Sequence, residues 1–396
     1  MDKNEKLILG ITMLAHGLVH GYMLTIPLLV PLWMQEWAIT EATIGLIVTA
    51  GYACFGLGSL PAGVVVDKIG SFKVMKLCML STGISLFLGG FAQGIYTLSL
   101  VLVLLGLSVS LYHSSGMTLV SKKISARGKA LGLHGVGGNL GVVALPALAS
   151  VLLLFMEWRA LLIIYAVPSL AVVILLYIID TQAIEGTLTK DEVGATESIN
   201  YKDMWNKKFI LLLLIYLFGG LYYRGSLTFL PSFFQRLNFP SLTLFGRSLA
   251  APSYLYSGVL IFGLLGQIIS GILNDYYSSS RLLIILSLAT AISLLLMPLL
   301  GIGLQVILIM LFGFLLFFLQ PVKNVMLAEN TEAERRGLAY GIAFLVNFGV
   351  GALGATVAGF VIQNYSYNFF FISLAIFAGL NFLVAISLEK EILNSE

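Results

Sequence analysis

Four histidines lie inside long apolar stretches of the sequence, where ionisable side chains are costly and mostly face an interior path. His16 and His20 are four residues apart, so they share one face of a helix. A metal site is the obvious interpretation, but it fails on count, because no carboxylate accompanies them and His113 and His134 lie far along the chain. We therefore predict no metal and no cofactor. Because histidine titrates near neutral pH, all four are candidates for carrying a proton, and the alternative is simple packing.

Arg224 is the most informative single residue. It lies 16 positions after Lys208 and 12 before Arg236, which corresponds to about 24 Å and about 18 Å along a helix. That depth is too great for the side chain to reach water easily. Its guanidinium matches a carboxylate or phosphate in bidentate fashion, and Tyr223 stands beside it. We predict a role in substrate binding or gating, and the alternative is a structural arginine bonded to helix carbonyls.

Lys323 forms a polar stripe with Gln320 and Asn324, at the spacing i, i+3 and i+4 of one helix face. We predict that this stripe lines a cavity. Because Lys323 lies nearer to the end of its apolar stretch than Arg224, its long side chain reaching out to water is the alternative.

Composition identifies the solvent that surrounds these residues. Of 396 residues, 59% are hydrophobic and only 10% are charged, whereas a soluble domain has about a quarter charged residues. A bilayer core requires roughly 20 apolar residues in a helix. We predict twelve spans: 7–32, 43–66, 74–96, 98–121, 128–153, 159–180, 208–235, 250–274, 281–301, 303–327, 336–362 and 367–388.

Charge divides and orients the chain. The segment between Asp180 and Lys208 is rich in charge, which predicts a solvated linker 181–207 between an N-terminal bundle 1–180 and a C-terminal bundle 208–396. Most lysines and arginines of the predicted loops fall on the side of both termini, so we expect cytoplasmic termini and a cell-membrane location. The net charge of +3 gives no reason to expect nucleic acid as a partner.

The two bundles resemble each other in sequence. A shift of 208 residues places Gly58, Gly63 and Asp67 on Gly266, Gly271 and Asp275, and a shift of 209 places the Arg127 region on the Arg336 region. Six helices per copy make the repeats parallel. Transporters with such repeats rock one half against the other around a central site.

The loop after the second span resembles the signature loop of the major facilitator superfamily, with Asp275 in a degraded second copy. The resemblance implies an all-α membrane protein of twelve helices in two parallel six-helix repeats. It also implies that Asp67 helps to latch the cytoplasmic ends of the halves by pairing with nearby cations, and the alternative is a solvated surface charge. The residues that carry this motif are Gly63, Asp67, Lys68, Gly70, Arg127 and Asp275.

A narrower resemblance covers helices 4 and 5. Tyr112-His113 and the run 136–141, followed by Pro146, look like the fosmidomycin-resistance type of exporter. The glycines of helix 5 also fit part of an antiporter-type motif, although its proline is displaced. We expect these glycines to serve close helix packing.

These patterns predict a secondary active transporter that moves a small organic anion by alternating access and is coupled to protons through the histidines. A proton-driven drug or antibiotic efflux pump is the alternative, and a membrane-embedded enzyme is a remote one. The expected partners are the anionic substrate and the lipid bilayer, and we expect a monomer. The predicted substrate-binding residues are Arg224, Lys323, His20, His113, Tyr223, Gln320 and Asn324.

Overall fold

The computed structural model describes residues 1–178, 204–332 and 335–394, and almost all of them are helical. The first half begins with a capping box, in which Asp2 and Glu5 each bond to the other's backbone N–H. Its helices are α1 (Lys3–Trp37), α2 (Glu41–Ile69), α3 (Ser71–Gly89), α4 (Ile95–Lys123), α5 (Arg127–Leu152) and α6 (Trp158–Ile178).

The second half contains six further spans and a short hairpin. Its elements are α8 (Lys207–Arg236), β1 (Leu242–Leu244), β2 (Arg247–Leu249), α9 (Ala251–Leu273), α10 (Ser279–Leu296), η3 (Met297–Leu299), α11 (Ile302–Glu329), α12 (Arg336–Phe344), η4 (Leu345–Gly349), η5 (Val350–Ala352), α13 (Leu353–Asn364) and α14 (Tyr367–Leu393).

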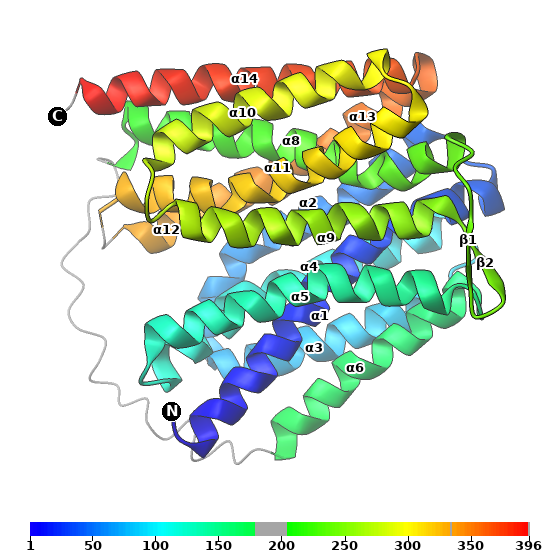
Figure 1. Ribbon diagram of the computed structural model, residues 1–396. Coiled ribbons are helices and arrows are strands. Elements are labelled where there is room, and N and C mark those ends of the chain that lie inside the picture. The colour runs from blue at the N-terminus through cyan, green and yellow to red at the C-terminus, as the bar shows by residue number, and fades with distance from the viewer. Residues whose placement is uncertain (179–203, 333–334, 395–396) are drawn as a thin grey trace.

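Twelve spans of the described chain are long and apolar enough to cross a membrane, as the sequence predicts. In Figure 1 the helices of the first half occupy mainly the lower part and those of the second half the upper part, with both termini on the left. We call that side the termini side and the opposite one the far side. The predicted linker 181–207 falls mostly outside the described residues, so the domain boundaries stay predictions.

Three local features differ from the predicted spans. The third span ends at Gly89 rather than at residue 96, because Gly90 and Gly94 open a loop. The antiparallel pair β1–β2 on the far side was not predicted. The span predicted for 336–362 is an α-helix that is interrupted by the π-helical turn η4 and the 3₁₀ turn η5.

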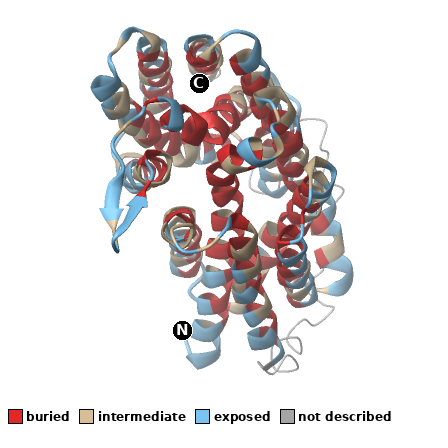
Figure 2. Cartoon of the chain, turned by 90° about the vertical axis from the view of Figure 1, so that its right-hand side faces the viewer, coloured by how far each residue is buried: buried red, intermediate tan, exposed pale blue. Residues whose placement is uncertain are grey.

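Exposed residues lie on the outer faces of the helices, and buried residues gather where helices meet (Figure 2). The contact between α1 and α5 explains part of the glycine pattern in helix 5. A Cβ atom on Gly141 would lie 2.0 Å from the carbonyl oxygen of Gly17, so only glycine allows this approach. Gly137 and Gly138 also pack closely, whereas Gly128, Gly132 and Gly135 have open space, and there the packing prediction is wrong.

Polar contacts between the halves lie toward the far side. Thr49 Oγ1 donates to the Ala352 carbonyl at 3.0 Å and accepts from Thr356 Oγ1 at 2.8 Å. Within the described ranges, no hydrogen bond joins the halves at the termini-side ends of the spans. The other far-side bonds join Tyr256 to Leu24, Ser150 to Ser253, Arg247 to Leu154 and Ala42 to Gln363.

Candidate functional site

Arg224 lies near the middle of α8 at the interface of the two halves, and its side chain is 2% exposed. Its guanidinium carbon stands 3.7 Å from the ring centroid of Tyr52 on α2, which is close enough for a cation–π interaction. Tyr223 and Phe348 complete an aromatic surround at 5.2 and 5.3 Å. The site therefore holds a permanent positive charge against aromatic faces from both halves.

One N–H donor of the Arg224 guanidinium has no hydrogen-bond acceptor within the described residues. Its Nε is buried and has no hydrogen-bond partner among the described residues. Buried polar groups nearly always have a partner, and an unpaired one is costly. This geometry favours the predicted binding role over a structural arginine capping helix carbonyls, because a structural role would leave no donor unused.

Lys323 lies on α11 and is 1% exposed, so its side chain does not reach out to water, and that alternative is wrong. Its Nζ lies 3.3 Å from Oδ1 of Asn347 in the turn η4, and 5.1 Å from the ring centroid of Tyr216. The Tyr216 hydroxyl donates to Asn324 at 2.9 Å. Two members of the predicted stripe thus converge on Tyr216, while Gln320 is half-buried and makes no described polar contact.

The two buried cationic residues of the second half both contact the π-helical turn η4. Lys323 contacts Asn347, and Arg224 contacts the next residue, Phe348. Asn347 is 1% exposed. A π-turn places more residues in one helical turn than an α-helix does, and such turns recur at functional sites.

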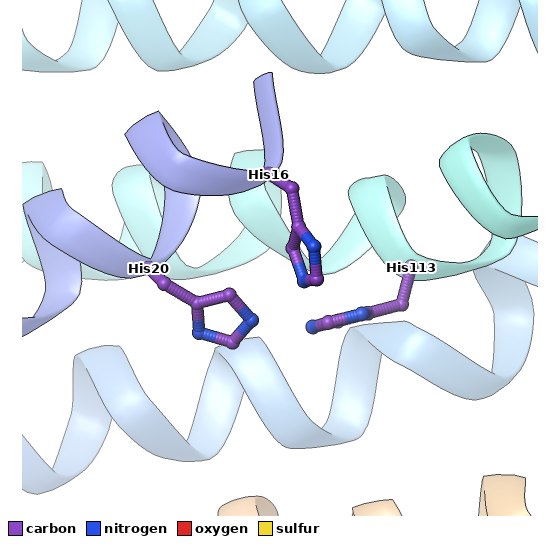
Figure 3. A group of neighbouring side chains, drawn as sticks. All are labelled: His16, His20 and His113. Carbon is purple, nitrogen blue, oxygen red and sulfur yellow. The ribbon is translucent and has the colours of Figure 1, made fainter. Parts of the chain in front are cut away.

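The first half contributes a compact cluster of imidazoles (Figure 3). His16 and His20 extend from α1, and His113 extends from the neighbouring helix α4. Their ring centroids are 4.8 to 5.4 Å apart in all three pairs. The i, i+4 spacing predicts the first pair, and the pairing of α1 with α4 supplies the third ring.

His134 on α5 is held differently. Its ring stacks on His16 at 4.3 Å, and its Nε2 lies 2.9 Å from the Tyr112 hydroxyl oxygen. That hydroxyl donates its single proton to the carbonyl of Thr12, so the histidine must be the donor in its bond with Tyr112. His134 is only 3% exposed and is held by this bond and by its stack on His16, which favours packing over a path-lining role.

Three phenylalanines connect the histidines with Arg224. Phe55 of α2 contacts Phe344 and Phe348 of the second half, with ring centroids 5.3 and 5.6 Å apart. Phe344 also covers His113 at 4.9 Å. These residues were not predicted from the sequence, because aromatic side chains are frequent throughout and only helix packing selects the ones at the interface. Asn347 carried a usable signal, since an amide in mid-span is unusual.

The predicted signature loop lies at the termini side. Gly70 joins α2 to α3 with a φ of +90°, a conformation that glycine adopts without strain. Asp67 and Asp275 are exposed, and no ion pair of either is found within the described residues. The latch therefore stays a prediction. The remaining motif residues are also on the surface or half-buried: Gly63, Lys68 and Arg127.

A twelve-span architecture with two similar halves and a buried cationic interface invites comparison with known transporters. The family model of the Major Facilitator Superfamily matches residues 11–252 and 241–392 of this chain. The chain belongs to this superfamily. It is a multi-pass membrane transporter, and the predicted fold class is confirmed.

Individual superfamily members are similar along most of their length. The "Probable 4-methylmuconolactone transporter" of Cupriavidus pinatubonensis is 26% identical, and the match covers 82% of this chain and 76% of the relative. The "Probable sulfoacetate transporter SauU" of Cupriavidus necator is 22% identical, with coverage of 69% and 65%.

Among solved structures, a bacterial homologue of the human lysosomal transporter Spinster, in an inward-facing and occupied conformation, superimposes with a TM-score of 0.80. The two chains are 13% identical, and the match covers 98% of each. At this identity the likeness shows the fold alone, and it agrees with the superfamily assignment. The narrower fosmidomycin-resistance resemblance stays a prediction.

Proposed function

We propose that this protein transports a small organic anion, which Arg224 binds between the two halves. The observation that carries this proposal is the buried guanidinium with an unpaired Nε beside Tyr52. A carboxylate or sulfonate oxygen is the natural acceptor for that donor. The names of the two relatives above refer to organic acids, which supports the same substrate class.

Charge balance also favours an anion. Arg224 and Lys323 are both buried, and no ion pair to either side chain is found in the described part of the chain. Uncompensated charge in a low-dielectric interior is expensive, so a bound anion relieves a cost that the empty site carries. A strongly cationic substrate would increase that cost. Of the other predicted binding residues, Tyr223 lies 5.2 Å from the guanidinium carbon of Arg224, and His113 is connected to Arg224 through Phe344 and Phe348.

The positions of the contacts support alternating access. Hydrogen bonds tie the halves together toward the far side, while the middle of the membrane is bridged by the aromatic contacts of Phe55 and Tyr52. With cytoplasmic termini, as the distribution of basic residues predicts, this state is inward-facing. Rocking the halves would open the far-side bonds and expose the Arg224 site to the other side.

Other parts of the prediction have less support. Drug or antibiotic efflux lacks a comparable argument, because the relatives above are named for metabolites rather than drugs. Proton coupling through His16, His20, His113 and His134 stays a prediction that a flux measurement across a pH gradient would test. The monomeric state and the absence of nucleic-acid partners also stay predictions.

The test is transport by purified protein in liposomes. A panel of radiolabelled monocarboxylates, dicarboxylates and sulfonates identifies a substrate, and its uptake is then compared between the wild type and Arg224→Ala. Hydrogen bonds to charged groups contribute about 1.5–3 kcal/mol each, so losing a bidentate pair lowers transport efficiency by about 100-fold or more. Arg224→Lys keeps the charge but loses the fork, so we expect intermediate transport.

A matched control distinguishes the loss of an arginine at the proposed binding site from the loss of an arginine elsewhere on the protein. Arg281 is an exposed residue of α10, and Arg281→Ala removes the same side chain without touching the interface. We expect wild-type transport from this variant. Anion uptake that is unchanged in a folded Arg224→Ala protein would overturn the proposal.

A further inference from the structure

We propose that His16, His20 and His113 form a binding site for a divalent transition-metal ion. One ligand nitrogen from each ring lies within 4.8 Å of the other two, and the three imidazoles converge on a common space (Figure 3). The sequence alone argued against a metal, because two histidines on one helix are too few ligands. Packing of α4 against α1 supplies the missing ligand.

The hydrogen bond of His16 fixes which of its nitrogens faces the site. Its Nδ1 lies 2.9 Å from the backbone carbonyl of His134. A carbonyl can only accept, so Nδ1 carries the proton and donates it, and Nε2 of the neutral ring keeps a free lone pair. Metal-binding histidines nearly always donate their second nitrogen to a carbonyl or carboxylate in this way.

His113 provides a second, independent observation. Its Nε2 is buried and has no hydrogen-bond partner in the described part of the chain. A buried ring nitrogen without a partner is costly and calls for an explanation. Coordination of a metal ion by the His113 ring would provide one, since one nitrogen of this ring lies within 4.8 Å of a nitrogen of His16 and of His20.

The spacing requires a modest closure of the cluster. Zinc binds imidazole nitrogen at about 2.0–2.1 Å, so two tetrahedral ligands stand about 3.3 Å apart. Closing the difference from 4.8 Å requires the His20 and His113 rings to rotate toward His16, and no side-chain hydrogen bond holds either ring among the described residues. The three ligands are thus already neighbours without the ion, and binding of the ion would draw them to coordination distance.

The ligand set selects the class of metal. Imidazole suits Zn²⁺, Ni²⁺, Co²⁺ and Cu²⁺, whereas Mg²⁺ and Ca²⁺ require oxygen ligands that this cluster does not offer. Three protein ligands leave a fourth position for water or another small ligand, as in open zinc sites. The positive charge of Arg224 is close enough to act on His20 and opposes a cation there, so we expect micromolar rather than nanomolar affinity.

Gly138 on α5 gives a way to disturb the site without removing a ligand. A Cβ atom at this position would lie 2.6 to 2.9 Å from the ring atoms of His16. Because the ring would have to move, Gly138→Ala should displace one ligand while all three histidines remain. We expect a loss of metal affinity of about tenfold, similar to the loss of a supporting contact.

The experiment is calorimetric titration of Zn²⁺ into tag-free, metal-stripped, full-length protein in detergent, with visible absorption of bound Co²⁺ reporting the ligand geometry. We expect one ion per chain in the wild type and a loss of affinity of about 100-fold or more in His20→Ala and in His113→Ala. Elution volume and melting temperature establish that each variant is folded, and Gly138→Ala tests the site if a histidine variant does not fold.

A control removes the other soft ligands of the chain. Cys54 and Cys78 are free thiols outside the cluster, and replacing both by alanine should leave the affinity for Zn²⁺ unchanged. Wild-type affinity in a folded His113→Ala protein would overturn the proposal. So would the absence of Zn²⁺ binding to the wild type, or its loss in the cysteine variant. Because no transport is measured, this result is independent of the anion proposal.

Discussion

In the first half, the buried polar groups of α1, α4 and α5 are tied to one another through His16, His134 and Tyr112. In the second half, Arg224 and Lys323 are held by aromatic faces and a single amide, and no carboxylate among the described residues pairs with either. The halves share one architecture, but the first satisfies its polar groups largely internally, while the second carries uncompensated positive charge. The two copies of a duplicated scaffold can therefore divide the chemistry of one site between them.

The largest effect is expected at the contact between Lys323 and Asn347, which is the only hydrogen bond of the Lys323 ammonium group among the described residues. Asn347→Leu removes the acceptor of Lys323 and leaves a buried ammonium group without a partner. An uncompensated buried donor costs about 1–3 kcal/mol, and more when it is charged, so the melting temperature in detergent should fall by several degrees.

The matched variants separate the charge from the amide. Lys323→Met alone removes the buried charge at similar length and should leave the melting temperature equal or higher. Adding Lys323→Met to Asn347→Leu should recover most of the lost stability. If the double variant is less stable than Asn347→Leu alone, the two side chains are not coupled through this contact.

A smaller effect concerns the aromatic support of Arg224. Tyr52→Leu removes the ring under the guanidinium, and a desolvated cation–π contact contributes up to about 2 kcal/mol. We expect anion affinity in a binding assay to fall by about tenfold. Tyr52→Phe keeps the ring but loses the hydroxyl, which donates to the Met23 carbonyl and is also hydrogen-bonded to Arg224, so its loss of affinity should be smaller than that of Tyr52→Leu. Equal losses in both variants would show that the hydroxyl, rather than the ring, supports the site.

The smallest effect concerns the contact between the halves. Thr49→Val keeps the shape of the side chain but removes its bonds to Ala352 and Thr356. At a net contribution of about 0.5 kcal/mol for each of the two bonds, the loss is about 1 kcal/mol, so the equilibrium between states should shift about fivefold toward opening of the far side. Spin labels on far-side loops of the two halves would report a longer distance. A Thr49→Ser protein restores the hydroxyl, and a shift of the same size there would contradict the hydrogen-bond explanation.

The sequence was sufficient for the twelve spans because apolar length alone determines them in a bilayer. It was also sufficient to place Arg224 deep in the membrane, since counting residues along a helix measures depth. It could not select Tyr52, Phe55 or Phe348, because their role depends on which helices pack together. Only part of the histidine cluster could be predicted. The i, i+4 spacing places His16 and His20 on the same helix face, but His113 lies on another helix, and the sequence does not show that the two helices pack together.

The π-helical turn η4 has a consequence for how this chain tolerates changes in length. Each residue of an α-helix turns the following side chains by about 100°. Deleting one residue of η4 would straighten the span and rotate one of its ends, so that either Asn347 and Phe348 or the small residues of α13 against α2 would face the wrong way. We therefore expect that η4 does not tolerate the insertions and deletions that surface loops accept. The additional residue of the π-helical turn determines how the residues near Arg224 are rotated relative to the α13 residues that contact α2.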